Sequence, residues 1–70
     1  MSVLKINGKE TPFEANGMPA TLAELLASLG VDAATVVAEV DGRIIERANF
    51  ATTTLRDGQN IELVRFVPGG

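Results

Sequence analysis

Residues 21–30 read TLAELLASLG and carry the signals for both ends of a helix. Thr21 and Glu24 form a capping box, in which the threonine hydroxyl accepts from the Glu24 backbone N–H and the Glu24 carboxylate reaches back to the Thr21 N–H. Apolar residues at positions 22, 25, 26 and 29 fall on one helical face. Gly30 stands where a left-handed C-terminal cap belongs. The segment therefore predicts an amphipathic helix over 22–29 that docks on a sheet.

Strands flank this helix on both sides, and glycine-containing turns separate them. Asn7-Gly8, Asp41-Gly42 and Asp57-Gly58 are turn dipeptides of the kind that accepts positive φ. Pro12 cannot donate to a strand ladder, so its strand is predicted to lie at an edge of the sheet. The runs between the turns have the composition of strands, over 3–6, 9–14, 36–40, 43–46 and 59–66.

The order of these elements is strand, strand, helix, strand, strand, strand, which predicts an α+β domain with one main helix across one face of a mixed sheet of about five strands. In the β-grasp (ubiquitin-like) arrangement the first and last strands are central neighbours, which suits two apolar strands. Residues 48–54 show no clean period, and we expect an irregular stretch or a short helical turn there, with Phe50 and Leu55 packing inward. We expect a single domain over 1–66 and a flexible Gly-Gly tail over 67–70.

The composition excludes several kinds of site. The 70 residues include no Cys and no His, which rules out a disulfide framework, a usual zinc site and the commonest nucleophile and base pairs. The net charge of −3 and the scattered Lys and Arg argue against a nucleic-acid partner. No segment resembles a signal peptide or a membrane span, so we expect a cytoplasmic protein with no membrane partner. Without a glycine-rich phosphate loop or an obvious carboxylate pair, we expect no catalysis, no metal and no bound cofactor.

The last strand is apolar on both of its faces. Alternation places Ile61 and Leu63 toward the helix, and it places Val64 and Phe66 on the opposite face. Val37 shares that opposite face, by the same alternation in its own strand. One interpretation is that strand twist or the 48–54 segment covers Val64 and Phe66. The other is that Val64, Phe66 and Val37 form a docking patch for a partner, because exposed apolar clusters usually mark partner sites.

The chain ends with Val67-Pro68-Gly69-Gly70, which contributes little to a fold because glycine buries no side chain and is costly to order. Gly69 and Pro68 are therefore predicted to thread a narrow channel, with the α-carboxylate of Gly70 as the reacting group. A carboxylate resists nucleophiles at neutral pH. Conversion to an acyl-adenylate by ATP makes it electrophilic, and a sulfur or amine nucleophile then displaces AMP.

The chain resembles the ubiquitin-like sulfur carrier proteins of thiamine biosynthesis, the ThiS family. The matching segments cover nearly the whole chain and are Asn7-Gly8, TLAELLASLG at 21–30, VVAEVDGRIIER at 36–47, TTLRDGQNIELVRFV at 53–67 and the final Gly69-Gly70. The resemblance implies that a ubiquitin-activating-like adenylyltransferase adenylates Gly70 with ATP. A sulfurtransferase or cysteine desulfurase then supplies sulfur for a thiocarboxylate, and a thiazole synthase takes that sulfur into the thiazole ring of thiamine. By this resemblance the chain is a carrier and co-substrate, not an enzyme.

Pro68 departs from the pattern of many relatives, which place a third glycine or a small flexible residue before the last pair. Proline fixes its own φ and biases Val67 toward extended backbone, so it stiffens the exit of the tail. A proline near the tail is also found in the small subunit of molybdopterin synthase, a related sulfur carrier. A carrier for molybdopterin or another pathway therefore stays open, as does a ubiquitin-type modifier or a β-grasp interaction domain.

Overall fold

The computed structural model describes residues 1–66, and the predicted helix is present as α1, Leu22–Ser28. The Thr21 hydroxyl accepts from the backbone N–H of Glu24 at 3.2 Å, as a capping box requires. The reciprocal bond differs from the prediction, because the Glu24 carboxylate accepts from the Thr21 hydroxyl at 3.2 Å and not from its backbone N–H. The helix ends at Ser28, one residue before the predicted end at Leu29, which is the C-cap, and Gly30 has the expected left-handed φ of +70°.

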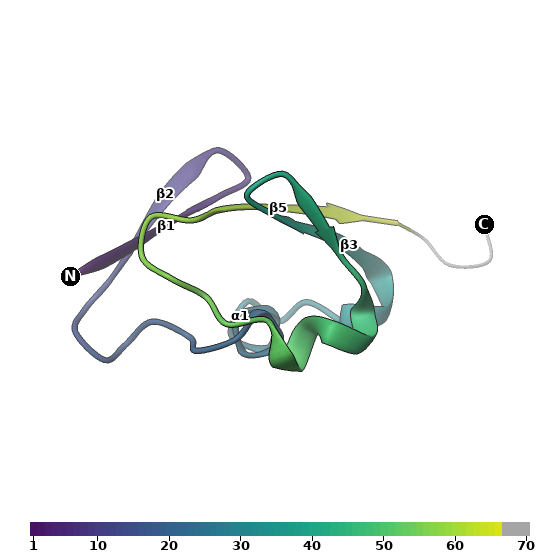
Figure 1. Cartoon of the computed structure of the whole chain (residues 1–70), viewed down its shortest axis with the longest axis horizontal. Coiled ribbons are helices and arrows are strands. Elements are labelled where there is room, and N and C mark those ends of the chain that lie inside the picture. The colour runs from purple at the N-terminus through teal and green to yellow at the C-terminus, as the bar shows by residue number, and fades with distance from the viewer. Residues whose placement is uncertain (67–70) are drawn as a thin grey trace.

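Residues 1–66 contain a five-stranded mixed sheet in the order β2-β1-β5-β3-β4 (Figure 1). The first and last strands are central neighbours and pair in parallel, whereas the other three pairings are antiparallel. This topology confirms the predicted β-grasp fold. Pro12 lies on an edge strand, as predicted. The strands are β1 (Ser2–Ile6), β2 (Lys9–Phe13), β3 (Val36–Val40), β4 (Arg43–Ile45) and β5 (Asn60–Arg65).

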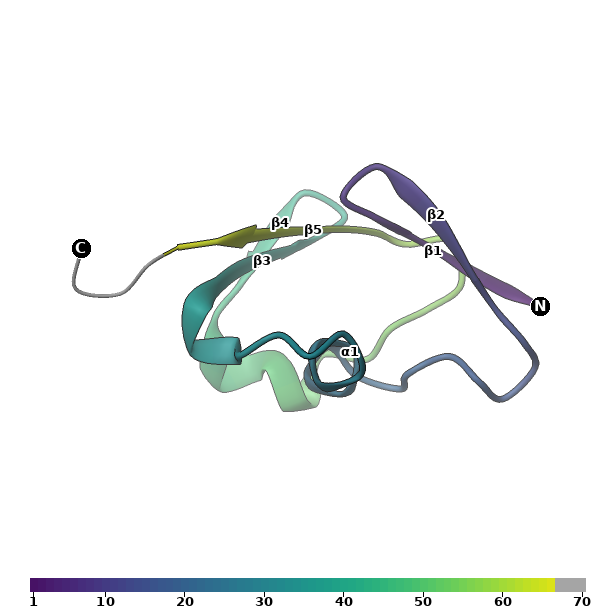
Figure 2. The same cartoon turned by 180° about the vertical axis from the view of Figure 1, so that it is seen from behind.

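Two short 3₁₀ helices complete the described part of the chain, η1 (Ala33–Thr35) before β3 and η2 (Arg47–Thr52) after β4. The second of them is the short helical turn expected within 48–54. Phe50 and Leu55 are both buried, as predicted. Because η2 packs beside α1, both elements lie on the same side of the sheet (Figure 2).

The core lies between α1 and the sheet. Its largest fully buried side chains come from the helix stripe and from the two central strands: Leu4, Leu22, Leu25, Leu26 and Ile61. Burial of such a side chain contributes about 1.5–3 kcal/mol relative to its exposure. No helix within residues 1–66 has the length and hydropathy that crossing a bilayer requires.

Candidate functional site

The sheet face turned away from α1, here called the outer face, carries the predicted docking residues. Val37 of β3 stands directly opposite Val64 of β5 in the antiparallel ladder. Their side chains are 42% and 59% exposed, and Phe66, which directly follows β5, is 46% exposed. We call Val37, Val64 and Phe66 the outer-face patch. The structure brings these three predicted residues to one surface.

The alternative interpretation, in which residues 48–54 or the strand twist cover Val64 and Phe66, is wrong. Val64 and Phe66 are both exposed, and η2 packs beside α1 (Figure 1), although Arg47 and Phe50 of η2 line a groove that Phe66 also lines. Ile61 and Leu63 have the orientation that alternation predicts, since Ile61 is fully buried and Leu63 packs against the core. The period-two pattern of β5 was therefore sufficient to assign its two faces.

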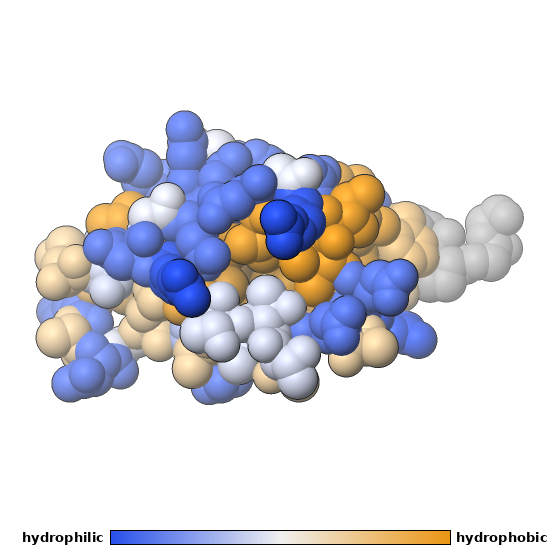
Figure 3. All heavy atoms as spheres, viewed as in Figure 1, coloured by the Kyte–Doolittle hydropathy of each residue, from blue (hydrophilic) through white to orange (hydrophobic). Residues whose placement is uncertain are grey.

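An open and largely apolar groove of about 390 Å³ extends the patch toward β4. Its lining includes Phe66, Val37 and Ile44 together with Arg47 and Phe50 of η2. In the space-filling view, apolar residues gather toward the end of the molecule where β5 stops (Figure 3). The apolar surface is thus concentrated beside the start of the tail.

Ile44 was not singled out from the sequence, although it is 66% exposed and belongs to the same surface. The two adjacent isoleucines were a signal in the sequence for an exposed apolar side chain. Ile44 and Ile45 are adjacent in a strand, so they point to opposite faces and one of them has to face outward. Only the structure shows which one, since that depends on the β3–β4 register, in which Ile44 stands opposite Glu39.

Two glutamates occupy facing positions on the outer face next to the patch. Glu39 of β3 stands directly opposite Glu62 of β5, two pairs further along the ladder than Val37 and Val64 and therefore on the same face. Like charges placed directly opposite on neighbouring strands are destabilising. The pair gives the apolar patch an acidic border, which favours a partner surface that combines apolar and basic side chains.

Phe66 is fixed to the sheet at the point where the described residues end. Its backbone N–H donates to the C=O of Thr35 at 2.9 Å, which continues the pairing of the last strand with the chain before β3. The predicted tail residues Pro68, Gly69 and Gly70 lie outside the described residues. The backbone is thus held in register up to the residue before the tail.

A mixed sheet with a parallel central pair and one main helix across one face defines the chain as a β-grasp protein. The sequence model of the ThiS family matches residues 4–70, so the match includes Gly69 and Gly70. The chain belongs to the ThiS family, which confirms the resemblance drawn from its sequence.

Solved structures of a thiamine biosynthesis protein (ThiS) from Geobacter metallireducens are similar to the whole chain. Its crystal structure is 34% identical, with a TM-score of 0.79, and the match covers 97% of this chain and 99% of that one. Its NMR solution structure is 36% identical, with a TM-score of 0.77, and the match covers 100% of this chain and 88% of that one.

A curated relative is much longer than this chain. A thiazole synthase from Paramagnetospirillum magneticum is 37% identical over 67 residues, which are 96% of this chain and 20% of that protein. The chain thus spans a fifth of the length of that relative. A protein named thiazole synthase therefore contains a segment similar to this chain.

Proposed function

We propose that this chain carries sulfur on its C-terminal glycine for thiazole formation in thiamine biosynthesis. A ubiquitin-activating-like adenylyltransferase joins the Gly70 carboxylate to AMP from ATP and releases pyrophosphate. The persulfide sulfur that a desulfurase or sulfurtransferase takes from cysteine displaces AMP and forms an acyl disulfide. A thiol then cleaves the acyl disulfide, which leaves a thiocarboxylate and a disulfide. Thiazole synthase then takes the sulfur. The chain is a co-substrate of these enzymes, with no cofactor of its own, and works in the cytoplasm.

The observation that carries this proposal is the ThiS-family match, which extends through Gly70. Two further findings support it. The similar Geobacter protein is named for thiamine biosynthesis, and the similar Paramagnetospirillum protein is named thiazole synthase. The chemistry also suits a chain without cysteine or histidine, because the activated group is the terminal carboxylate and no side chain has to act as nucleophile.

The outer-face patch is proposed as the surface by which the adenylyltransferase recognises the folded domain. Val37, Val64 and Phe66 present apolar side chains next to the start of the tail, with the Glu39 and Glu62 carboxylates at their border. A partner that covers this patch holds the tail close to its own reaction centre. In this arrangement Pro68 directs the exit of the tail, and Gly69 and Gly70 enter a narrow channel.

The test is intact mass spectrometry after incubation with ATP, the adenylyltransferase, cysteine desulfurase and cysteine. Replacement of one carboxylate oxygen by sulfur adds about 16 Da to the mass. Deletion of Gly70 is the matched control, because it removes the reacting group and leaves the described domain unchanged in sequence. The deletion variant should gain no mass and should retain the unfolding transition of the wild type.

Other outcomes would overturn the proposal. Conjugates joined to lysine side chains of other proteins would indicate a ubiquitin-type modifier. A thiocarboxylate whose sulfur is accepted by molybdopterin synthase and not by thiazole synthase would assign the carrier to the other pathway. Unfolding of the Gly70 deletion variant would show that the tail is structural.

A further inference from the structure

The C-terminal half of β5 has an open backbone edge on the side of β1. The two strands pair where β1 ends and β5 begins, through Lys5 with Asn60 and Ile6 with Ile61. The chain then leaves the sheet at the Asn7-Gly8 turn, while β5 continues to Arg65. A central strand therefore acquires an edge where its neighbour turns away.

Asn7 extends the ladder one step beyond the end of β1. Its backbone N–H donates to the C=O of Ile61 at 2.8 Å, and its side-chain Oδ1 accepts from the N–H of Leu63 at 2.7 Å. The carboxamide oxygen thus takes the place of a strand carbonyl beside Glu62. Asn7 can do so because it holds a φ of +50°, which asparagine tolerates better than most residues.

The next groups along this edge are the C=O of Leu63 and the N–H of Arg65. The side of β5 to which these two groups point follows from the ladder with β3, where the N–H of Phe66 donates to Thr35 and the C=O of Asn60 accepts from Asp41. Even-numbered residues of β5 bond toward β3, so odd-numbered residues bond toward β1. Among residues 1–66, no hydrogen bond reaches the Leu63 C=O or the Arg65 N–H.

These two groups have the spacing that a parallel strand requires. In the existing ladder, Lys5 lies beside Asn60 and Asn7 lies beside Glu62. Each of them donates its N–H to the β5-side residue that precedes its neighbour and accepts from the N–H of the residue that follows its neighbour. One residue of an incoming segment, placed beside Val64, would donate its N–H to the Leu63 C=O and accept from the Arg65 N–H through its own C=O. The edge is therefore shaped to continue a pattern that the protein has already begun.

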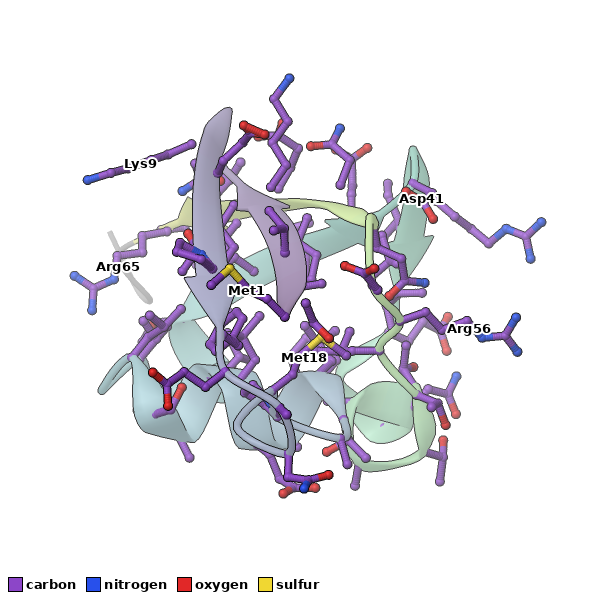
Figure 4. The ribbon with its side chains drawn as sticks, turned by 90° about the vertical axis from the view of Figure 1, so that its left-hand side faces the viewer. Met1, Lys9, Met18, Asp41, Arg56 and Arg65 are labelled. Atoms are coloured by element: carbon purple, nitrogen blue, oxygen red, sulfur yellow. The ribbon has the colours of Figure 1, made fainter. Side chains whose placement is uncertain are left out.

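The surroundings of this edge suit an extended polypeptide. Val64 is exposed on the outer face, and Leu63 is half-buried on the inner face, so an incoming strand meets an apolar side chain on each side. The exposed side chains of Lys9 and Arg65 both extend outward on the same side of the molecule (Figure 4). Arg65 belongs to the edge itself, while the Glu62 carboxylate lies on the outer face beside Val64, so charges of both signs border the incoming segment.

We propose that an extended segment of thiazole synthase adds to this edge of β5 as a further strand. The inference rests on the proposed function, from which it takes the partner, and it adds the mode of binding. Strand addition draws affinity from main-chain hydrogen bonds and specificity from alternate side chains. It also places the partner's backbone directly beside the strand that leads into the tail, so the tail and the acceptor enzyme are aligned by one ladder.

Hydrogen exchange at single amides tests the inference on the unmodified chain with purified thiazole synthase. The Arg65 amide should exchange freely in the isolated chain and should be slowed at least tenfold in the complex. The Val64 amide is the internal control, because it bonds toward β3 and should be protected in both states. Binding without added protection at Arg65 would overturn strand addition and leave the proposed function intact. Absence of binding to thiazole synthase would overturn both.

A pair of substitutions at position 65 tests the same bond by affinity. Arg65→Pro removes the edge N–H without removing any hydrogen bond within residues 1–66, whereas Arg65→Thr removes the charge and keeps the N–H. The proline variant should raise the Kd for thiazole synthase at least tenfold more than the threonine variant does. Equal effects of the two variants would assign the binding to the side chain and overturn the inference. Should Arg65→Pro fail to fold, the exchange measurement decides alone.

Discussion

The two faces of the sheet are built from the same kinds of residue and meet different surroundings. On the inner face, Leu4, Ala38 and Ile61 are completely buried beneath α1 and η2. On the outer face, Val37 and Val64 stand side by side and remain exposed. Adjacent positions of the same strands thus serve separate purposes, since the inner face holds the domain together and the outer face is available to a partner.

The largest expected effect separates the two faces on a single strand. Ile61→Ala should lower the free energy of unfolding by about 2–5 kcal/mol, because it leaves a cavity in the core. Val64→Ala should lower it by less than about 1 kcal/mol, because an exposed side chain loses only its cross-strand contact with Val37. Urea denaturation followed by circular dichroism measures both values. Similar losses for the two variants would show that the outer face also supports the fold.

The next effect concerns binding. Phe66→Asp should weaken binding to the adenylyltransferase about tenfold, which corresponds to about 1.4 kcal/mol, because it places a charge within the outer-face patch. Its unfolding free energy should change by less than this, since Phe66 is 46% exposed and keeps its backbone bond to Thr35. Titration calorimetry gives the affinity, and urea denaturation is the control. An unchanged affinity would remove Phe66 from the docking surface.

A smaller effect is expected where the helix begins. Thr21→Ala should lower the unfolding free energy by about 1 kcal/mol, because the N–H of Glu24 loses its capping acceptor. Thr21→Ser is the matched control, since it keeps the hydroxyl. Neither variant should alter affinity for the adenylyltransferase, because α1 lies on the inner side of the sheet. A change in affinity would show that the two faces are coupled.

Sequence reasoning was most successful where a feature depends on local spacing. The capping box, the turn dipeptides and the alternation of Ile61 with Val64 are read from neighbouring residues, and they gave the helix, the hairpins and the faces of β5. The features it missed depend on which strands pair and in what register. The exposure of Ile44, the opposition of Glu39 and Glu62, and the role of Asn7 in the β5 ladder all require residues distant in sequence to be aligned first.

The smallest expected effect is at that carboxylate pair. Glu62→Gln should raise the unfolding free energy by a few tenths of a kcal/mol at low salt, because it removes a like charge directly opposite Glu39. At about 1 M salt the gain should vanish, since screening then acts over about 3 Å. Urea denaturation at the two salt concentrations measures the difference. A stability gain accompanied by weaker binding to the adenylyltransferase would mean that the outer face retains this unfavourable pair for its partner. A stability gain with unchanged binding would limit the docking surface to the apolar residues.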